Sequence, residues 1–241
     1  MDREEPPIAL ASYERMADLY ASQLATKPHN AYYERPALLA LLPSLSGKQV
    51  LDLGCGPGLY AEHLLTEGAA HVTAVDVSPR MVQLASERLA QQKVDVHLAD
   101  VSEGLPFVPA AQFDLAIAPL MIHYLRHLDT AFTEINRVLK PGGRFVFSTH
   151  HPMAEYPGDS ASGIYFDTEP VEQIWGELGS VRFFRRPLSD ITEALSSSGF
   201  VIERLVEPKP TEAFREVSLR GYEGLMRSPN FLLIRARKET L

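Results

Sequence analysis

The sequence VLDLGCGPG at residues 50–58 decides the fold of this chain. It predicts a short buried strand that ends at Gly54 and turns through a run of glycines into a helix. A dinucleotide-binding turn has the pattern G-x-G-x-x-G, whereas the glycines here stand at 54, 56 and 58 and Leu59 follows them. The third glycine of the pyrophosphate register is therefore missing. With Asp52 near the end of the strand, the turn favours a cationic ligand that has no phosphate groups.

Strands and helices alternate on both sides of this turn. The hydrophobic patterns predict strands at 50–54, 71–76, 94–100, 113–118 and 144–150, and helices at 59–68, 78–92 and 129–143. A further helix at 188–199 precedes strands at 200–208 and 230–238. Such alternation predicts an α/β fold with a mainly parallel sheet that is covered on both faces.

The whole chain, 1–241, is predicted to be one domain, because 241 residues are too few for two full α/β domains. It divides into an N-terminal helical cap at 1–45, a core at 46–150, an insert at 151–182, and a C-terminal helix and strands at 183–241. The insert is rich in prolines, glycines and aromatic residues, which predicts a packed lid.

Composition narrows the class of protein. The chain is 45% hydrophobic and 22% charged, which is typical of a globular domain, and its formal net charge is −8. An acidic balance disfavours a nucleic-acid partner. The single cysteine excludes an internal disulfide and favours an intracellular protein. With neither a targeting segment nor an apolar run of membrane-spanning length, we expect a cytoplasmic protein without a membrane partner.

Four motifs in order resemble those of the class I S-adenosylmethionine-dependent methyltransferases, in particular the members that act on small molecules. They are VLDLGCGPG at 50–58, VTAVDVSPRMVQLA at 72–85 followed by HLADV at 97–101, FDLAIAPLMIHYL at 113–125, and RVLKPGGRFVFSTHHP at 137–152. The resemblance implies a Rossmann-like, doubly wound, mainly parallel seven-stranded sheet with an antiparallel C-terminal strand. It also implies S-adenosyl-L-methionine as cofactor and S-adenosyl-L-homocysteine as product.

The resemblance also assigns the nucleoside half of the cofactor site. Asp76 would accept hydrogen bonds from both ribose hydroxyls, because a carboxylate offers two oxygens. Val77 and Met81 would flank the adenine, Asp100 would accept from the adenine amino group, and the backbone of Val101 would contact the ring. The alternative for Asp76 and Asp100 is that they cap a helix or a turn.

The methionine half of the site is assigned to the glycine turn by the same resemblance. Gly54 and Gly56, with Cys55 between them, would pass beneath the methionine portion. Asp52 would lie near its ammonium group, and Pro119 would border the sulfonium. The alternative for Asp52 is a turn-capping acid, and that for Cys55 is a small buried residue.

Histidines are the predicted catalytic residues. His123 follows the fourth strand, and His150 and His151 end the fifth, so all three are expected near the crevice at the carboxyl ends of the strands. A neutral histidine there would take a proton from the acceptor during methyl transfer, whereas a structural hydrogen bond is the alternative. His123 and His127 have the spacing of metal ligands on a helix, but a carboxylate is missing from their neighbourhood, so we predict no metal.

Four further side chains are predicted to contact the acceptor: Tyr124, Tyr156, Trp175 and Arg185. The arginine would bind an acidic acceptor, with a solvated or helix-capping role as the alternative. In the N-terminal cap, five side chains are candidates to close over the cofactor: Tyr20, Asn30, Tyr32, Tyr33 and Arg35.

The sequence thus predicts an enzyme that transfers a methyl group to an oxygen or nitrogen of a small-molecule acceptor, as a monomer or homodimer. Two alternatives stay open: a methyltransferase that modifies RNA or protein, and a non-catalytic protein that binds S-adenosylmethionine. A nicotinamide oxidoreductase is disfavoured by the missing glycine.

Overall fold

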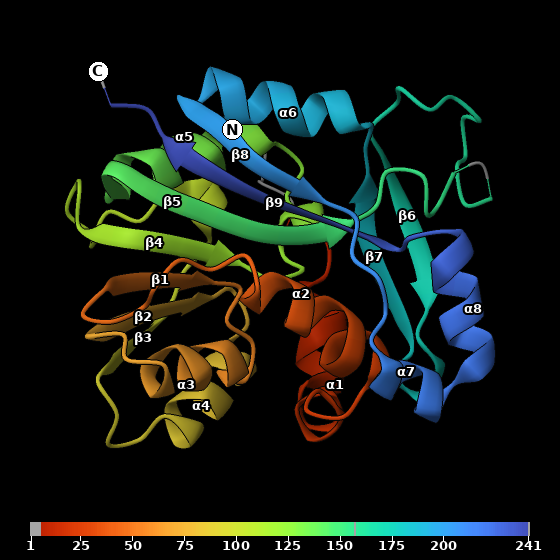
Figure 1. Ribbon diagram of the computed structural model, residues 1–241, viewed down its shortest axis with the longest axis horizontal. Helices are drawn as coiled ribbons and strands as arrows, with labels where there is room; N and C mark the ends of the chain where they lie inside the picture. The colour runs from red at the N-terminus through yellow and green to blue at the C-terminus, as the bar shows by residue number, and fades with distance from the viewer. Residues whose placement is uncertain (1–5, 157, 241) are drawn as a thin grey trace.

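A seven-stranded sheet forms the centre of the computed structural model, with strand order β3-β2-β1-β4-β5-β9-β8 (Figure 1). Its strands are β1 (Gln49–Leu53), β2 (His71–Asp76), β3 (Val94–Leu98), β4 (Phe113–Ala118), β5 (Leu139–His150), β8 (Phe200–Val206) and β9 (Phe231–Lys238). The first five strands run parallel, and β9 pairs antiparallel with both β5 and β8. The predicted sheet is confirmed. The structure describes residues 6–156 and 158–240.

Helices cover both faces of this sheet (Figure 1). On one face lie α5 (Leu128–Val138) and α6 (Leu188–Ser197). On the other lie α3 (Leu59–Thr66) and α4 (Pro79–Arg88), together with residues of the N-terminal cap. Ser78 begins α4 as predicted, because its hydroxyl accepts a hydrogen bond of 3.1 Å from the amide of Met81.

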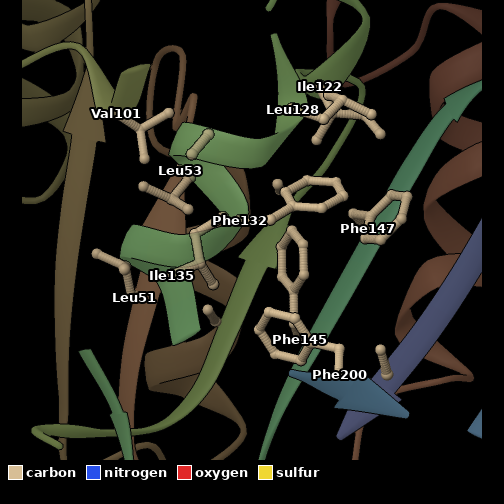
Figure 2. Close-up of a cluster of buried hydrophobic side chains, with 14 of the residues drawn as sticks. Leu51, Leu53, Val101, Ile122, Leu128, Phe132, Ile135, Phe145, Phe147 and Phe200 are labelled. Carbon is tan, nitrogen blue, oxygen red and sulfur yellow. The ribbon is translucent and has the colours of Figure 1, made fainter. Parts of the chain in front are cut away.

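The two hydrophobic cores follow from the alternation of side chains along each strand. On β1, Leu51 and Leu53 pack on the side of α5, where Figure 2 shows them near Phe132 and Ile135. Val50 packs on the side of α3, and Asp52 shares that face because it lies two residues further along. The fold therefore places one carboxyl group inside an otherwise apolar layer.

The N-terminal cap consists of three short segments. These are α1 (Leu10–Gln23), a π-helical turn η1 (Asn30–Glu34) and α2 (Arg35–Leu39). Pro36 lies in the first turn of α2, where its missing amide hydrogen costs nothing. The helical cap predicted for residues 1–45 is thus present within the described residues.

The second half of the insert, which was predicted to be a packed lid, begins a β-hairpin. Strand β6 (Glu169–Ile174) pairs antiparallel with β7 (Ser180–Arg185) in a separate two-stranded sheet. The hairpin continues past the predicted end of the insert at residue 182. In Figure 1 it stands at one end of the main sheet, where β7 contacts α1.

Two other boundaries differ from the prediction. The helix predicted at 129–143 ends at Val138, because the chain enters β5 at Leu139 through a register shift opposite Phe113. Gly143 belongs to the strand, where an added Cβ would lie 2.9 Å from the carbonyl oxygen of Lys140. The segment before β9 also holds two helices that were not predicted, α7 (Glu212–Val217) and α8 (Leu219–Arg227).

Candidate functional site

A cavity of about 1580 Å³ opens at the carboxyl ends of β1, β2 and β4. Its walls come from the glycine turn, the ends of these strands, the N-terminal cap and the β6–β7 hairpin. A pocket for a single drug-sized ligand measures about 300–1,000 Å³. The cavity therefore has room for a cofactor and an acceptor together. It lies where the topology of an open α/β sheet places a ligand.

The glycine turn gives the cavity its floor. Gly54, Gly56 and Gly58 all have positive φ angles, of 65°, 54° and 86°. A Cβ on Gly54 would lie 2.5 Å from Cγ of Met121, so this position has space for glycine alone. Cys55 is buried, and burial raises the pKa of its thiol well above the ordinary value, which keeps it neutral. These features agree with a binding role for the turn and leave Cys55 without nucleophilic character.

Asp76 ends β2 and faces the cavity with both oxygens anchored. Its Oδ2 accepts a hydrogen bond of 2.8 Å from the amide of Gly56, and its Oδ1 accepts one of 2.9 Å from the amide of Ser78. Burial raises the pKa of Asp76, and the amide donors oppose that rise. The carboxylate is thereby fixed in one orientation, with lone pairs left for a ligand that has two adjacent hydroxyls.

The next part of the wall belongs to the region predicted to hold adenine. Val77, Met81 and Val101 line it, and Met81 and Val101 are buried. Asp100 also lines the cavity, and its Oδ1 caps the 3-10 turn η2 (Val101–Glu103) by accepting 2.8 Å from the amide of Ser102. Asp100 therefore caps a turn, which was the alternative to a role in binding adenine. It also borders the cavity.

Asp52 lies behind the glycine turn and is fully buried. Both carboxyl oxygens lack a hydrogen-bond partner among the described residues. Burial raises the pKa of Asp52 to about 7, and the nearby charge of Asp76 adds to the rise. A buried carboxyl group without a partner is costly to a fold, and it needs an explanation outside packing.

The sulfonium end of the predicted site lies at the end of β4. Pro119, Leu120 and Met121 line the cavity there. Leu120 has a positive φ of 48°, which strains a non-glycine residue. Its amide is held by Ser148, whose carbonyl oxygen lies at 3.1 Å and whose hydroxyl oxygen lies at 2.9 Å. The strain is therefore maintained by the neighbouring strand β5.

A buried acid of the N-terminal cap joins this network. Glu34 accepts 2.6 Å from the hydroxyl of Ser148 and 2.8 Å from the hydroxyl of Tyr60. Burial raises the pKa of Glu34. The next residue, Arg35, lines the cavity, donates 2.8 Å to the carbonyl of Leu24, and has a buried Nε without a partner in the described chain. An arginine held in this way can donate hydrogen bonds to the carboxylate of a ligand.

Three tyrosines form a further wall of the cavity. The hydroxyls of Tyr13 and Tyr124 are 2.7 Å apart, and their rings meet edge to face at 5.5 Å. Tyr20 makes the same kind of contact with Tyr13, also at 5.5 Å. Burial raises the pKa of all three phenols, so they are neutral hydrogen-bonding groups. Tyr124, a predicted acceptor contact, therefore lines the cavity, and its contact with an acceptor stays a prediction.

Contrary to the prediction, His123, His150 and His151 lie outside this cavity. His123 is buried against the ring of His150, with centroids 4.3 Å apart, and burial lowers its pKa well below the ordinary value. His150 is bound to Glu155 at 2.8 Å, and His151 to Glu207 at 2.9 Å. These contacts match the structural alternative. His127, which had been considered for metal binding, lines the cavity instead.

Three predicted acceptor contacts also lie elsewhere. Arg185 is buried inside the insert, where it pairs with Glu169 at 2.9 Å and donates to backbone carbonyls of residues 164–167. Tyr156 packs edge to face on Tyr165 in the same insert, and Trp175 lies beneath the ammonium of Lys27 at 4.8 Å. The insert uses Arg185 and Tyr156 for its own packing, because a short hairpin has little core of its own, whereas Trp175 packs against the N-terminal cap.

Other lining residues gave no recognisable signal in the sequence. They include Tyr13, Glu34 and Tyr60, and Arg182 and Phe184 from β7. Each lies outside the family-like motifs, and its position depends on how the cap and the hairpin fold over the sheet.

Within the described residues, none of the helices has the length and apolar character needed to cross a bilayer.

Comparison with known proteins identifies the family of this fold and site. A family model described as a methyltransferase domain matches residues 51–147. A malonyl-[acyl-carrier protein] O-methyltransferase from Pseudescherichia vulneris is 36% identical over 218 residues, which are 89% of this chain and 77% of that protein. The protein of the same name from Erwinia billingiae is 41% identical over 103 residues, which are 43% of this chain and 39% of that protein.

A solved structure extends the similarity to the whole fold. The S-adenosylmethionine-dependent methyltransferase from Mesorhizobium loti is 31% identical, with a TM-score of 0.75, and the match covers 85% of this chain and 97% of that one. The glycine turn, the anchored Asp76 and this similarity agree. The chain belongs to the class I S-adenosylmethionine-dependent methyltransferases, and S-adenosylmethionine is its cofactor.

Proposed function

We propose that this enzyme methylates an oxygen of a small acceptor that carries a carboxylate. The observation that carries the proposal is the similarity to the O-methyltransferase of Pseudescherichia vulneris, which extends over most of both chains. The name of that relative describes a malonyl group on an acyl-carrier protein, and the free end of a malonyl group is a carboxylate. A carboxylate is already ionised at neutral pH, so its methylation needs no general base. The location of the three predicted histidines outside the cavity is consistent with such an acceptor.

We assign the cofactor contacts as follows. Asp76 would bind the ribose hydroxyls, and Val77, Met81 and Val101 would surround the adenine. Arg35 would pair with the cofactor's carboxylate, because its guanidinium has donor capacity left at the cavity wall. When bound, the cofactor supplies an activated methyl group on a sulfonium centre.

The residues of the chain would then orient the acceptor and exclude water. Tyr13 and Tyr124 form a neutral wall that offers hydroxyl hydrogen bonds without a charge. The hairpin adds Phe184 and Arg182 to the lining. The space left beside the cofactor would hold an acceptor of small size.

A labelled-methyl assay with two matched thioesters tests this proposal. Malonyl-pantetheine carries a free carboxylate, whereas acetyl-pantetheine has the same thioester and lacks it. We expect methyl transfer from S-adenosylmethionine to malonyl-pantetheine alone. If a metabolite extract instead gives methylated products on nitrogen only, the assignment to oxygen is wrong. If the protein binds S-adenosylhomocysteine but transfers to nothing, the non-catalytic alternative is favoured.

A further inference from the structure

Three carboxyl groups gather beneath the methionine end of the cavity. Glu34 and Asp52 are buried, and Asp76 forms part of the wall. Glu34 and Asp76 each receive two hydrogen bonds from the protein. Asp52 differs from them, because among the described residues its oxygens make no hydrogen bond of normal geometry, although the backbone amide of Ala61 lies close enough to favour the charged form. The carboxyl group of Asp52 is therefore not satisfied by the hydrogen bonds of the protein.

Every element packed around Asp52 brings either an acid or a neutral group. Strand β2 contributes Asp76, the glycine turn contributes the neutral thiol of Cys55, and α3 contributes Tyr60 and the backbone amide of Ala61. On β4 the register partner of Asp52 is Ile117. Beyond Tyr60 lie Glu34, itself an acid, and the guanidinium group of Arg35, which is 5.9 Å from the centre of the Tyr60 ring and acts on Glu34. An ionised Asp52 is thus opposed by its surroundings, and of the described groups that act on Asp52 the amide of Ala61 favours the charge.

The bound cofactor changes this balance, because its ammonium group brings a positive charge to the methionine end of the site, while Arg35 would neutralise the cofactor's carboxylate. We propose that cofactor binding releases a proton from Asp52, so that the ammonium group is stabilised by a carboxylate that is protonated in the empty protein. Direct contact is not required, since an opposite charge within about 4–6 Å favours the ionised form. The proton leaves to the solvent. This inference rests on the cofactor assignment and is independent of which acceptor is methylated.

Proton linkage of this kind sets the size of the effect. The pKa of Asp52 in the empty protein is about 7, so most molecules carry the proton at pH 6.5 and few carry it at pH 8.5. With complete ionisation in the complex, binding should release roughly 0.8 proton at pH 6.5 and less than about 0.1 at pH 8.5. The dissociation constant of S-adenosylhomocysteine should rise about tenfold for each pH unit below 6.5, because binding must then remove the proton.

Isothermal titration calorimetry in buffers of different ionisation enthalpy measures the released proton directly. We expect the enthalpy of S-adenosylhomocysteine binding at pH 6.5 to differ between phosphate and imidazole buffers, and the enthalpies at pH 8.5 to agree between Tris and borate buffers. The control ligand is 5′-methylthioadenosine, which keeps the nucleoside and lacks the ammonium group. At each pH it should bind with the same enthalpy in both buffers.

The variant Asp52→Asn identifies the source of the proton. It should still bind S-adenosylhomocysteine, more weakly, and its enthalpy should no longer depend on the buffer. Undiminished proton release in the variant would assign the proton to Asp76 or to another group and overturn the proposal. So would an enthalpy independent of buffer in the unmodified protein, a result that needs no variant. Failure to bind S-adenosylhomocysteine at all would instead contradict the cofactor assignment.

Discussion

The replacement Asp52→Asn should change the pH dependence of stability in the empty protein. The folded-state pKa of Asp52 is about 7, against an ordinary value of 3.8. Because the folded protein holds this proton more tightly than the unfolded chain does, stability falls as pH rises from about 4 to about 7 and then levels off. A shift of about 3 pKa units corresponds to roughly 4 kcal/mol of lost stability above pH 7.

Asparagine removes this loss because it cannot ionise. Between pH 5 and pH 8 the loss grows by roughly 2–3 kcal/mol in the unmodified protein. For a chain of this size, 1 kcal/mol shifts Tm by about 2–4 °C. The Tm of the variant relative to the unmodified protein should therefore rise by roughly 5–10 °C more at pH 8 than at pH 5.

Thermal unfolding followed by circular dichroism at both pH values measures this difference. The comparison across pH cancels the constant cost of burying the asparagine amide, which also lacks partners. Asp114→Asn is the matched control, because this partly exposed carboxylate pairs with Lys140 at 2.9 Å and its pKa is lowered. An equal Tm change at both pH values for Asp52→Asn would show that the buried carboxyl group titrates normally, and the reasoning would be refuted.

Three other replacements test the site. Asp76→Ala should abolish most of the rise in Tm that S-adenosylhomocysteine causes, because a ligand stabilises only as far as it binds the native state. Arg35→Gln should weaken S-adenosylhomocysteine about tenfold or more and leave 5′-methylthioadenosine unchanged, as measured by calorimetry, since only the former has a carboxylate. An equal loss for both ligands would place Arg35 away from that carboxylate. His150→Asn should lower Tm by disturbing the contact with Glu155, while the pH–rate profile keeps its shape. Loss of a rate increase between about pH 6 and 7 would restore the histidine as a base.

The sequence predicted the central sheet well because its signals are local. The apolar run of β1 is followed by Gly54, and that of β2 is preceded by Gly68. Ser78 and Pro79 together predict the start of α4. The helix predicted at 129–143 was too long, because helical periodicity does not reveal that the chain enters β5 at Leu139. That boundary depends on pairing with Phe113 on a distant strand.

The cofactor wall was predictable for a similar reason. Gly54, Asp76 and Met81 lie within two continuous motifs, and the cavity is lined by all three. The acceptor side was not predictable, because its residues come from segments far apart in the chain. Tyr13 and Tyr124 are separated by 111 residues, and only the folded cap brings their hydroxyls to 2.7 Å. The histidines were placed near the crevice by their positions at strand ends, but the direction of their side chains follows from packing against Phe183 and Glu155.

Buried acids near the cofactor site add an electrostatic cost to the folded protein, and the bound cofactor would reduce this cost. Glu34, Asp52 and Asp76 all have raised pKa values because burial disfavours their charged forms. A cation that enters this region removes part of that cost, so the binding energy reflects relief of repulsion as well as new contacts. The same carboxyl groups that weaken the empty fold would then select a positively charged ligand. A neutral residue at position 52 would remove the loss of stability between pH 5 and pH 8 and would reduce that selection. If this account holds, the same variant must gain relative Tm as pH rises and must bind S-adenosylhomocysteine more weakly.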